Sequence, residues 1–234
     1  MPTKKPRKAG TRPPLTRERV LKVALTLVDR SGIESLSMRK VAGKLGVEAM
    51  SLYHHVANKD DLVEGLVALV LDEIAVPPAG TPWRDAMRAR ALSARAVFLR
   101  HPAAVVLVES CATMTESRLR YSDAVVGLLM ADGFTVAQAY RAFLLLDSYV
   151  YGFTLQELSW PRPENTRAVD DAALVPRVSF AAFPHFAQVM GHVLGEVGRL
   201  GLVPAYDAEF EFGLDLVLDS LERLRAAGSR PAPT

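Results

Sequence analysis

Hydrophobic residues recur every three or four positions along most of this chain, which is the spacing of one buried helix face. The first such run comprises Val20, Val23, Ala24, Leu27 and Val28. Thr16 stands where an N-cap residue is needed and Gly32 where a helix can end, so the pattern predicts a helix between them. Four prolines before Leu15 exclude regular structure there and predict a flexible basic arm over residues 1–14.

Three more helices are predicted to follow closely. Ser37 can cap a helix that ends at Gly46, and a third helix covers about residues 48–54. Asn58 can cap a fourth helix, which runs to about Ala75. Two short helices separated by a turn that contains glycine are typical of a helix-turn-helix.

A proline-rich segment from Val76 to Pro82 breaks the pattern, and Thr81 followed by Pro82 predicts the start of another helix. Beyond it the spacing predicts helices at about 82–101, 103–111, 115–132, 135–159, 183–200 and 206–227. Thr135 and Gln138 have the spacing of a capping box, and residues 159–184 are predicted to form a long loop. No segment alternates as a strand would, so the predicted fold class is all-α, without internal repeats.

Composition bounds the protein class. Half of the 234 residues are hydrophobic, enough for one or two domains with a sizeable core. The single cysteine, Cys111, fits a reducing compartment. The basic N-terminus lacks the apolar segment of a signal peptide, and the longest uncharged window, Val178 to Gly195, is too interrupted to span a membrane. We therefore expect a soluble, cytoplasmic protein without a membrane partner.

Charge is distributed unevenly. Residues 1–59 hold thirteen Lys and Arg against four acids, a net charge of +9, whereas the remainder holds fifteen Arg against twenty-two acids, a net charge of −7. All seven lysines lie in the first part. This asymmetry predicts that the N-terminal part alone meets a polyanion.

The helix-turn-helix pattern indicates which polyanion. Val41, Leu45, Val47, Leu52 and Val56 can be buried against the first helix, which leaves a polar face on the third helix. Together with a cation on each side, the candidate DNA-contacting residues are Arg39, Ala49, Met50, Ser51, Tyr53, His54, His55 and Lys59. Such a face suits base edges and phosphates in the major groove.

His54 and His55 also raise the alternatives of a metal site or an acid–base site. Adjacent helical residues do not share a face, and no cysteine or acid stands beside them at ligand spacing. We therefore expect no metal and no cofactor here. A second polar stripe comprises His185, Gln188, His192 and Glu196, and its spacing fits either a pocket wall or a solvated helix face.

The run SMRKVAGKLGVEAMSLYHHVANKDDLVEGL closely resembles the DNA-binding motif of the TetR family of transcriptional repressors. The segment FEFGLDLVLDSLERL resembles the last helix of that family's regulatory domain. The resemblance implies a helix-turn-helix domain over 15–66 and a helical regulatory and dimerisation domain over 67–234. It also implies a homodimer that binds a palindromic operator. Ala49 and Met50 replace the glutamine and proline common at these positions, so the operator sequence stays open.

The resemblance further implies a small-molecule effector and a dimeric four-helix bundle. The expected bundle residues are Leu144, Tyr151, Leu155, Phe210, Leu214, Val217, Leu221 and Leu224. The candidate effector residues are Arg90, Glu109, Tyr121, Tyr149, Gln156 and Trp160. Because the polar set of tetracycline-binding relatives is absent, tetracycline is not expected. Arg90 could instead pair with an anionic ligand, although a surface salt bridge is the commoner role of an arginine.

The expected function is thus a ligand-responsive repressor, and not an enzyme. The alternative of a helical-bundle enzyme lacks its usual signatures, since the chain has no Glu-x-x-His pair, no Gly-x-Ser-x-Gly and no glycine-rich phosphate loop. Activation in place of repression stays open, because it depends on where the operator lies.

Overall fold

The structure, a computed structural model, describes residues 14–111, 113–159, 182–200 and 206–228. Every regular element in this part of the chain is helical, which confirms the all-α prediction. The elements are α1 (Arg17–Ser31), the 3₁₀ turn η1 (Ile33–Ser35), α2 (Met38–Leu45), α3 (Ala49–Leu52), α4 (Lys59–Glu73), α5 (Trp83–Arg100), α6 (Pro102–Ser110), α7 (Glu116–Ala131), α8 (Val136–Ser159), α10 (Pro184–Leu200) and α11 (Tyr206–Gly228).

Local capping chemistry sets several helix starts as predicted. The side chains of Thr16, Ser37 and Asn58 accept the backbone N–H three residues on, at 3.2, 3.3 and 2.8 Å. Before α8, the Thr135 N–H donates to Gln138 Oε1 at 2.9 Å and the Gln138 N–H donates to Thr135 Oγ1 at 3.3 Å. The expected capping box is therefore present.

The start of α5 differs from the prediction. Pro82, not Thr81, is its N-cap residue, and the Thr81 hydroxyl donates instead to the Pro78 carbonyl at 2.9 Å. The N–H of Trp83, the first residue of α5, has no acceptor within the helix. It donates instead to the carboxylate of Asp132, directly after α7. A residue 49 positions away replaces the local cap, so sequence spacing could not find it.

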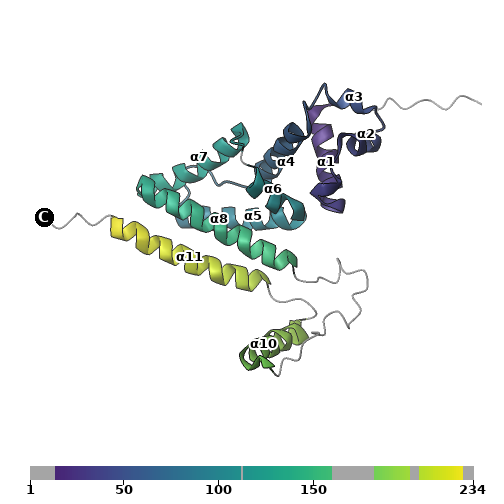
Figure 1. Ribbon diagram of the computed structural model, residues 1–234. Helices are drawn as coiled ribbons and strands as arrows, with labels where there is room; N and C mark the ends of the chain where they lie inside the picture. Colours follow the sequence, from purple (N-terminus) through teal and green to yellow (C-terminus); the bar gives the residue numbers. More distant parts are fainter. Residues whose placement is uncertain (1–13, 112, 160–181, 201–205, 229–234) are drawn as a thin grey trace, which may run out of the picture.

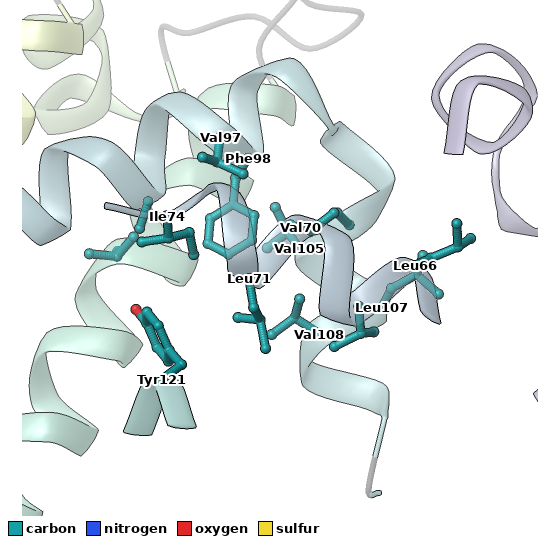
Figure 2. Close-up of a cluster of buried hydrophobic side chains, with 14 of the residues drawn as sticks. Leu66, Val70, Leu71, Ile74, Val97, Phe98, Val105, Leu107, Val108 and Tyr121 are labelled. Carbon is teal, nitrogen blue, oxygen red and sulfur yellow. The ribbon is translucent and has the colours of Figure 1, made fainter. Parts of the chain in front are cut away.

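Helices α1 to α4 form a head at one end of the molecule, and α5 to α8 with α11 form a body (Figure 1). Helix α4 belongs to both, because it packs on α1 and also on α6 and α7. Figure 2 shows Leu66, Val70 and Leu71 of α4, with Ile74 directly after the helix, among side chains of α5, α6 and α7. The domain boundary expected after residue 66 thus lies inside one continuous helix.

Helices α4 and α1 approach each other closely at Gly65. A Cβ atom on Gly65 would lie 2.5 Å from Cδ2 of Leu21, whose side chain is buried in the head. The missing side chain lets the two helices approach closely at this one point. A larger residue at position 65 would have to displace the buried side chain of Leu21.

Arginines of α5 hold the body together. Arg84 pairs with Asp219 of α11 at 2.7 Å, and Arg88 pairs with Asp215 at 2.9 Å. The buried guanidinium of Arg95 meets both oxygens of Glu157 in α8, at 2.8 and 2.9 Å. These pairs connect α5 to both of the long helices beside it.

The pair between Arg95 and Glu157 supports a prediction on stability. Glu157→Ala leaves a buried guanidinium whose remaining ionic partner among the described residues is the exposed Asp207, at a cost of about 3 kcal/mol or more. For a chain of this size we expect a fall in Tm of roughly 10 °C. Glu116→Ala, which breaks the exposed i,i+4 pair with Arg120, is the control and should leave Tm nearly unchanged. Equal Tm values for the two variants would contradict the role of Glu157.

Candidate nucleic-acid interface and ligand pocket

The turn between α2 and α3 has helix-turn-helix geometry. Gly46 adopts φ 68° and ψ 36°, the left-handed conformation that favours glycine. The N–H of Val47 then donates to the Ala42 carbonyl at 3.1 Å, which closes the end of α2. Leu52 and Val56 are buried against the head core, so α3 has a fixed inner side.

The outer side of α3 carries residues expected to contact DNA. Met50 is 70% exposed and Tyr53 is 46% exposed, both high for apolar and aromatic side chains. Arg39, His54 and Lys59 are also exposed, while Ala49, Ser51 and His55 are partly buried. All eight predicted residues thus lie at the surface of the head, and their contact with DNA stays a prediction.

Helix α3 is shorter than predicted. It ends at Leu52, and Tyr53, His54 and His55 lie in a turn after it, where the His55 N–H donates to the Leu52 carbonyl at 2.8 Å. Lys40 and Lys44 of α2 and Lys22 of α1 are also exposed on the head. The described lysines therefore all lie on the head, as their sequence positions require.

An ion pair that sequence analysis missed holds this turn. Arg17, the first residue of α1, donates to both oxygens of Asp61 in α4, at 2.6 and 3.1 Å, and to the His55 carbonyl at 2.9 Å. Asp61 also accepts the N–H of Ala57 at 2.7 Å. The hydrogen bond from Arg17 lowers the pKa of Asp61. The sequence shows Asp61 only as an acid in a first helical turn.

The body contains a pocket of about 490 Å³ between α4, α6, α7 and α8. One end of α4 contributes Leu71, and α8 contributes the longest wall. The lining residues are Leu71, Val108, Glu109, Met114, Arg118, Tyr121, Ser122, Phe143, Leu144, Asp147, Ser148, Tyr151 and Leu155. A mostly apolar lining with a few polar groups is typical of small-molecule sites.

The polar wall of the pocket rests on a buried arginine. Arg90 of α5 donates to the Tyr121 hydroxyl at 2.7 Å and to Asp147 Oδ1, and its guanidinium lies 5.2 Å from the centre of the Tyr121 ring. Burial raises the pKa of Tyr121 to about 12 and also raises the pKa of Asp147, while Arg90 opposes both shifts. Arg90 thus orients two pocket-lining groups from behind, and its Nη1 has no partner among the described residues.

Comparison with known proteins identifies the family. Residues 20–66 match the model of the bacterial regulatory proteins of the tetR family, and residues 76–225 match the Tetracyclin repressor-like C-terminal domain. The chain belongs to the TetR family of transcriptional regulators. This confirms the resemblance noted in its sequence.

Relatives and solved structures of the family agree along nearly the whole chain. The HTH-type transcriptional repressor DrrR1 of Streptomyces coeruleorubidus is 32% identical over 93% of this chain and 81% of its own length. The class G tetracycline repressor protein of Vibrio anguillarum is 31% identical over 89% of this chain and 94% of its own. ActR of Streptomyces coelicolor, solved in complex with actinorhodin, has a TM-score of 0.70 at 26% identity and covers 94% of this chain and 99% of its own.

The candidate effector residues separate into two groups. Glu109 and Tyr121 line the pocket, and Arg90 lies behind its wall. The ion pair that Arg90 forms with Asp147 is buried, and not at the surface as expected. Tyr149 and Gln156 do not line it: the Tyr149 hydroxyl donates to the Phe210 carbonyl at 2.8 Å, and Gln156 is exposed. Trp160 lies outside the described residues. Asp147 also lines the pocket although it was not among the candidate effector residues, and it is recognisable as a lone acid in an apolar run.

The bundle residues expected on α11 require a correction. Phe210, Leu214 and Leu221 are 0, 0 and 2% exposed within a single chain, so they face its own core and are not available to a partner. Val217 and Leu224 are partly buried. The large apolar side chains exposed on this helix are Phe212 and Leu216, at 64 and 54%. The more regular stripe of α11 serves the internal core.

Helix α8 shows a similar division. Tyr151 is partly buried and lines the pocket, whereas Leu144 and Leu155 are 53 and 39% exposed at its rim. Further exposed apolar side chains on α8 are Val136, Tyr140 and Leu145. We call these three, with Leu144, Leu155, Phe212 and Leu216, the α8–α11 apolar face.

The second polar stripe lies on α10, which stands apart from the body in Figure 1. His185, Gln188 and His192 are exposed, and the side chain of Glu196 lies outside the described part. Within the described residues no group of three or more His, Cys, Asp or Glu could hold a metal ion. No single described helix is long and apolar enough to span a membrane, although the sharply bent pair α5 and α6 passes that test when joined.

The pocket acid Glu109 gives a prediction on pH dependence. Glu109 is exposed at the pocket, and its partial desolvation there, with the negative charge of Asp147, raises its pKa. Its ionised form is therefore disfavoured in the folded state, and stability is lost as the pH rises through the folded pKa. Glu109→Gln should raise Tm slightly at about pH 7, and the gain should vanish at about pH 4, where both side chains are neutral. Glu116→Gln, on an exposed face, is the control; a gain at both pH values would refute this origin.

Proposed function

We propose that this protein is a repressor that binds a palindromic operator as a homodimer and leaves it when a small molecule occupies the body pocket. The observation that carries the proposal is the joint presence of an exposed recognition face on α3 and a lined pocket connected by α4. Membership of the TetR family supports both halves. Such a function places the protein in the cytoplasm with its DNA.

Helix α4 is the proposed link between the pocket and DNA. It begins at Lys59, directly after the turn that follows α3, and Leu71 near its other end lines the pocket. Because α4 crosses α1 closely at Gly65, a ligand that displaces Leu71 would rotate α4 about this crossing. The turn that carries Tyr53, His54 and His55, which we call the recognition turn, would then move together with the start of α4. A ligand shifts the equilibrium only by binding one of these two arrangements more tightly.

The pocket walls indicate the class of effector. Phe143, Tyr121 and Tyr151 offer aromatic surfaces, and Asp147 offers a carboxylate whose Oδ1 is held by Arg90. A flat, largely apolar molecule with hydrogen-bond donors at its edge fits these groups. The complex of ActR with actinorhodin supports this proposal, since ActR resembles this chain over nearly its whole length.

Dimerisation is proposed through the α8–α11 apolar face. Phe212 and Leu216 of α11 and Tyr140 and Leu144 of α8 are all more than half exposed in the single chain. A monomer seldom exposes so many large apolar side chains on two adjacent helices without a partner. A dimer built on this face would hold two heads at once to the two operator half-sites.

Selection of bound DNA from a random pool, with the full chain, tests the proposed function. We expect enrichment of a palindromic sequence, because two identical heads read two half-sites. Tyr53→Ala should weaken binding to the selected sequence by about 1–3 kcal/mol, whereas Lys59→Ala should weaken selected and random duplexes alike. A pool that shows no enrichment would contradict sequence-specific binding. Activation by the same operator contacts is distinguished afterwards by transcription from the selected site.

The proposed dimer surface predicts different outcomes for two aspartate substitutions on α11. Phe212→Asp places a carboxylate in the partner contact, so the chain should stay folded but sediment as a monomer. Its binding to a palindrome should fall by a factor of about a hundred, because the linkage of two half-sites is lost. Leu221→Asp buries a charge in the core of one chain and should lower Tm sharply. A folded dimer from Phe212→Asp would show that the partner contact lies elsewhere.

A further inference from the structure

Arg17 and Asp61, which form an ion pair, each also make a hydrogen bond to the backbone of the recognition turn or the residues directly after it. Arg17 Nη1 holds the carbonyl of His55, and Asp61 Oδ2 holds the N–H of Ala57, at 2.9 and 2.7 Å. Between these two residues, Val56 is buried. One backbone acceptor and one backbone donor of the turn are thus fixed by two side chains that also bind each other.

The recognition helix needs such support from outside. Helix α3 has only four residues, too short to be stable or rigid by itself. Leu52 and Val56 anchor its inner side, but apolar contacts are not directional and leave the rotation of the segment weakly defined. Hydrogen bonds to the backbone are directional and can define it.

We propose that Arg17 is a positioning residue for sequence-specific DNA recognition, which together with Asp61 fixes the backbone that carries Tyr53, His54 and His55. This inference rests on the proposed DNA-binding function. Arg17 connects the first turn of α1 with the first turn of α4, so the turn keeps its orientation relative to both helices. Misplacement of the turn would cost base contacts, while general attraction to phosphates would persist.

A simpler role for Arg17 is direct attraction to phosphate, because its side chain is 45% exposed. The two roles predict opposite effects of a change at Asp61. Loss of a negative charge beside DNA strengthens a purely electrostatic interaction. Loss of the partner that positions Arg17 and the turn weakens specific recognition instead. Asp61→Asn therefore separates the two roles by the sign of its effect.

The test measures Kd for the selected operator and for a random duplex of equal length, with Tm measured for each full-length variant. Arg17→Met and Asp61→Asn should each reduce the ratio of specific to non-specific affinity by about tenfold. Binding of Asp61→Asn to the random duplex should be unchanged or tighter. Arg17→Lys, which keeps the charge but not the two-point geometry, should reduce the ratio to an intermediate value.

The control is the neighbouring pair Lys22 and Glu18, an exposed i,i+4 pair at 2.5 Å on the same helix. Lys22→Met removes the same charge as Arg17→Met without releasing the turn, so its affinity ratio should change less than about twofold. Tighter or unaltered operator binding by Asp61→Asn would overturn the positioning role. If a variant unfolds, Arg17→Lys decides, and a wild-type ratio in that variant counts against the proposal. A wild-type protein without operator preference would instead refute the proposed function.

Discussion

The packing of the body depends on the pairing of two arginine charges that are buried away from water. Arg90 and Arg95 of α5 are 1 and 7% exposed, and an unpaired guanidinium at such depth would be costly. Asp147 and Glu157 of α8 form ion pairs with Arg90 and Arg95, respectively. Tyr121 of α7 completes the surroundings of Arg90. The relative placement of three helices is thus constrained by the geometry of two guanidinium groups.

The ion pairs of α5 also determine the direction of α11. From Arg84 through Arg88 to Arg95, the partners run backwards along α11, from Asp219 through Asp215 to Asp207. Such an order is possible only for antiparallel helices. Most of these outer pairs are solvent-exposed and add little free energy each, so their contribution is to register more than to stability. The apolar face of α8 and α11 depends on this register.

Local rules predicted the parts of this fold that depend on neighbouring residues. Most helix limits, the caps at Thr16 and Asn58, and the capping box before α8 follow from contacts within a few positions. The predictions were wrong at Trp83, where a distant carboxylate serves as the cap, and for α3, which ends at Leu52.

The candidate sites were harder to predict for the same reason. An apolar stripe such as that of Phe210 and Leu214 does not reveal whether it faces the chain's own core or a partner. The pocket combines residues of four helices, and its acid Asp147 is paired with Arg90 on a fifth. Arg17 and Asp61 are 44 positions apart, so no short window of the sequence shows that the two side chains pair and hold the recognition turn.

The confinement of every lysine to residues 1–59 has a practical consequence for handling the protein. Reagents that attack primary amines will modify Lys22, Lys40, Lys44 and Lys59 on the exposed surface of the head, and no side chain of the body. Attachment to a sensor chip by amine coupling would therefore turn the head toward the matrix and obstruct it. Immobilised DNA with the protein in solution avoids this, because the head then stays unmodified.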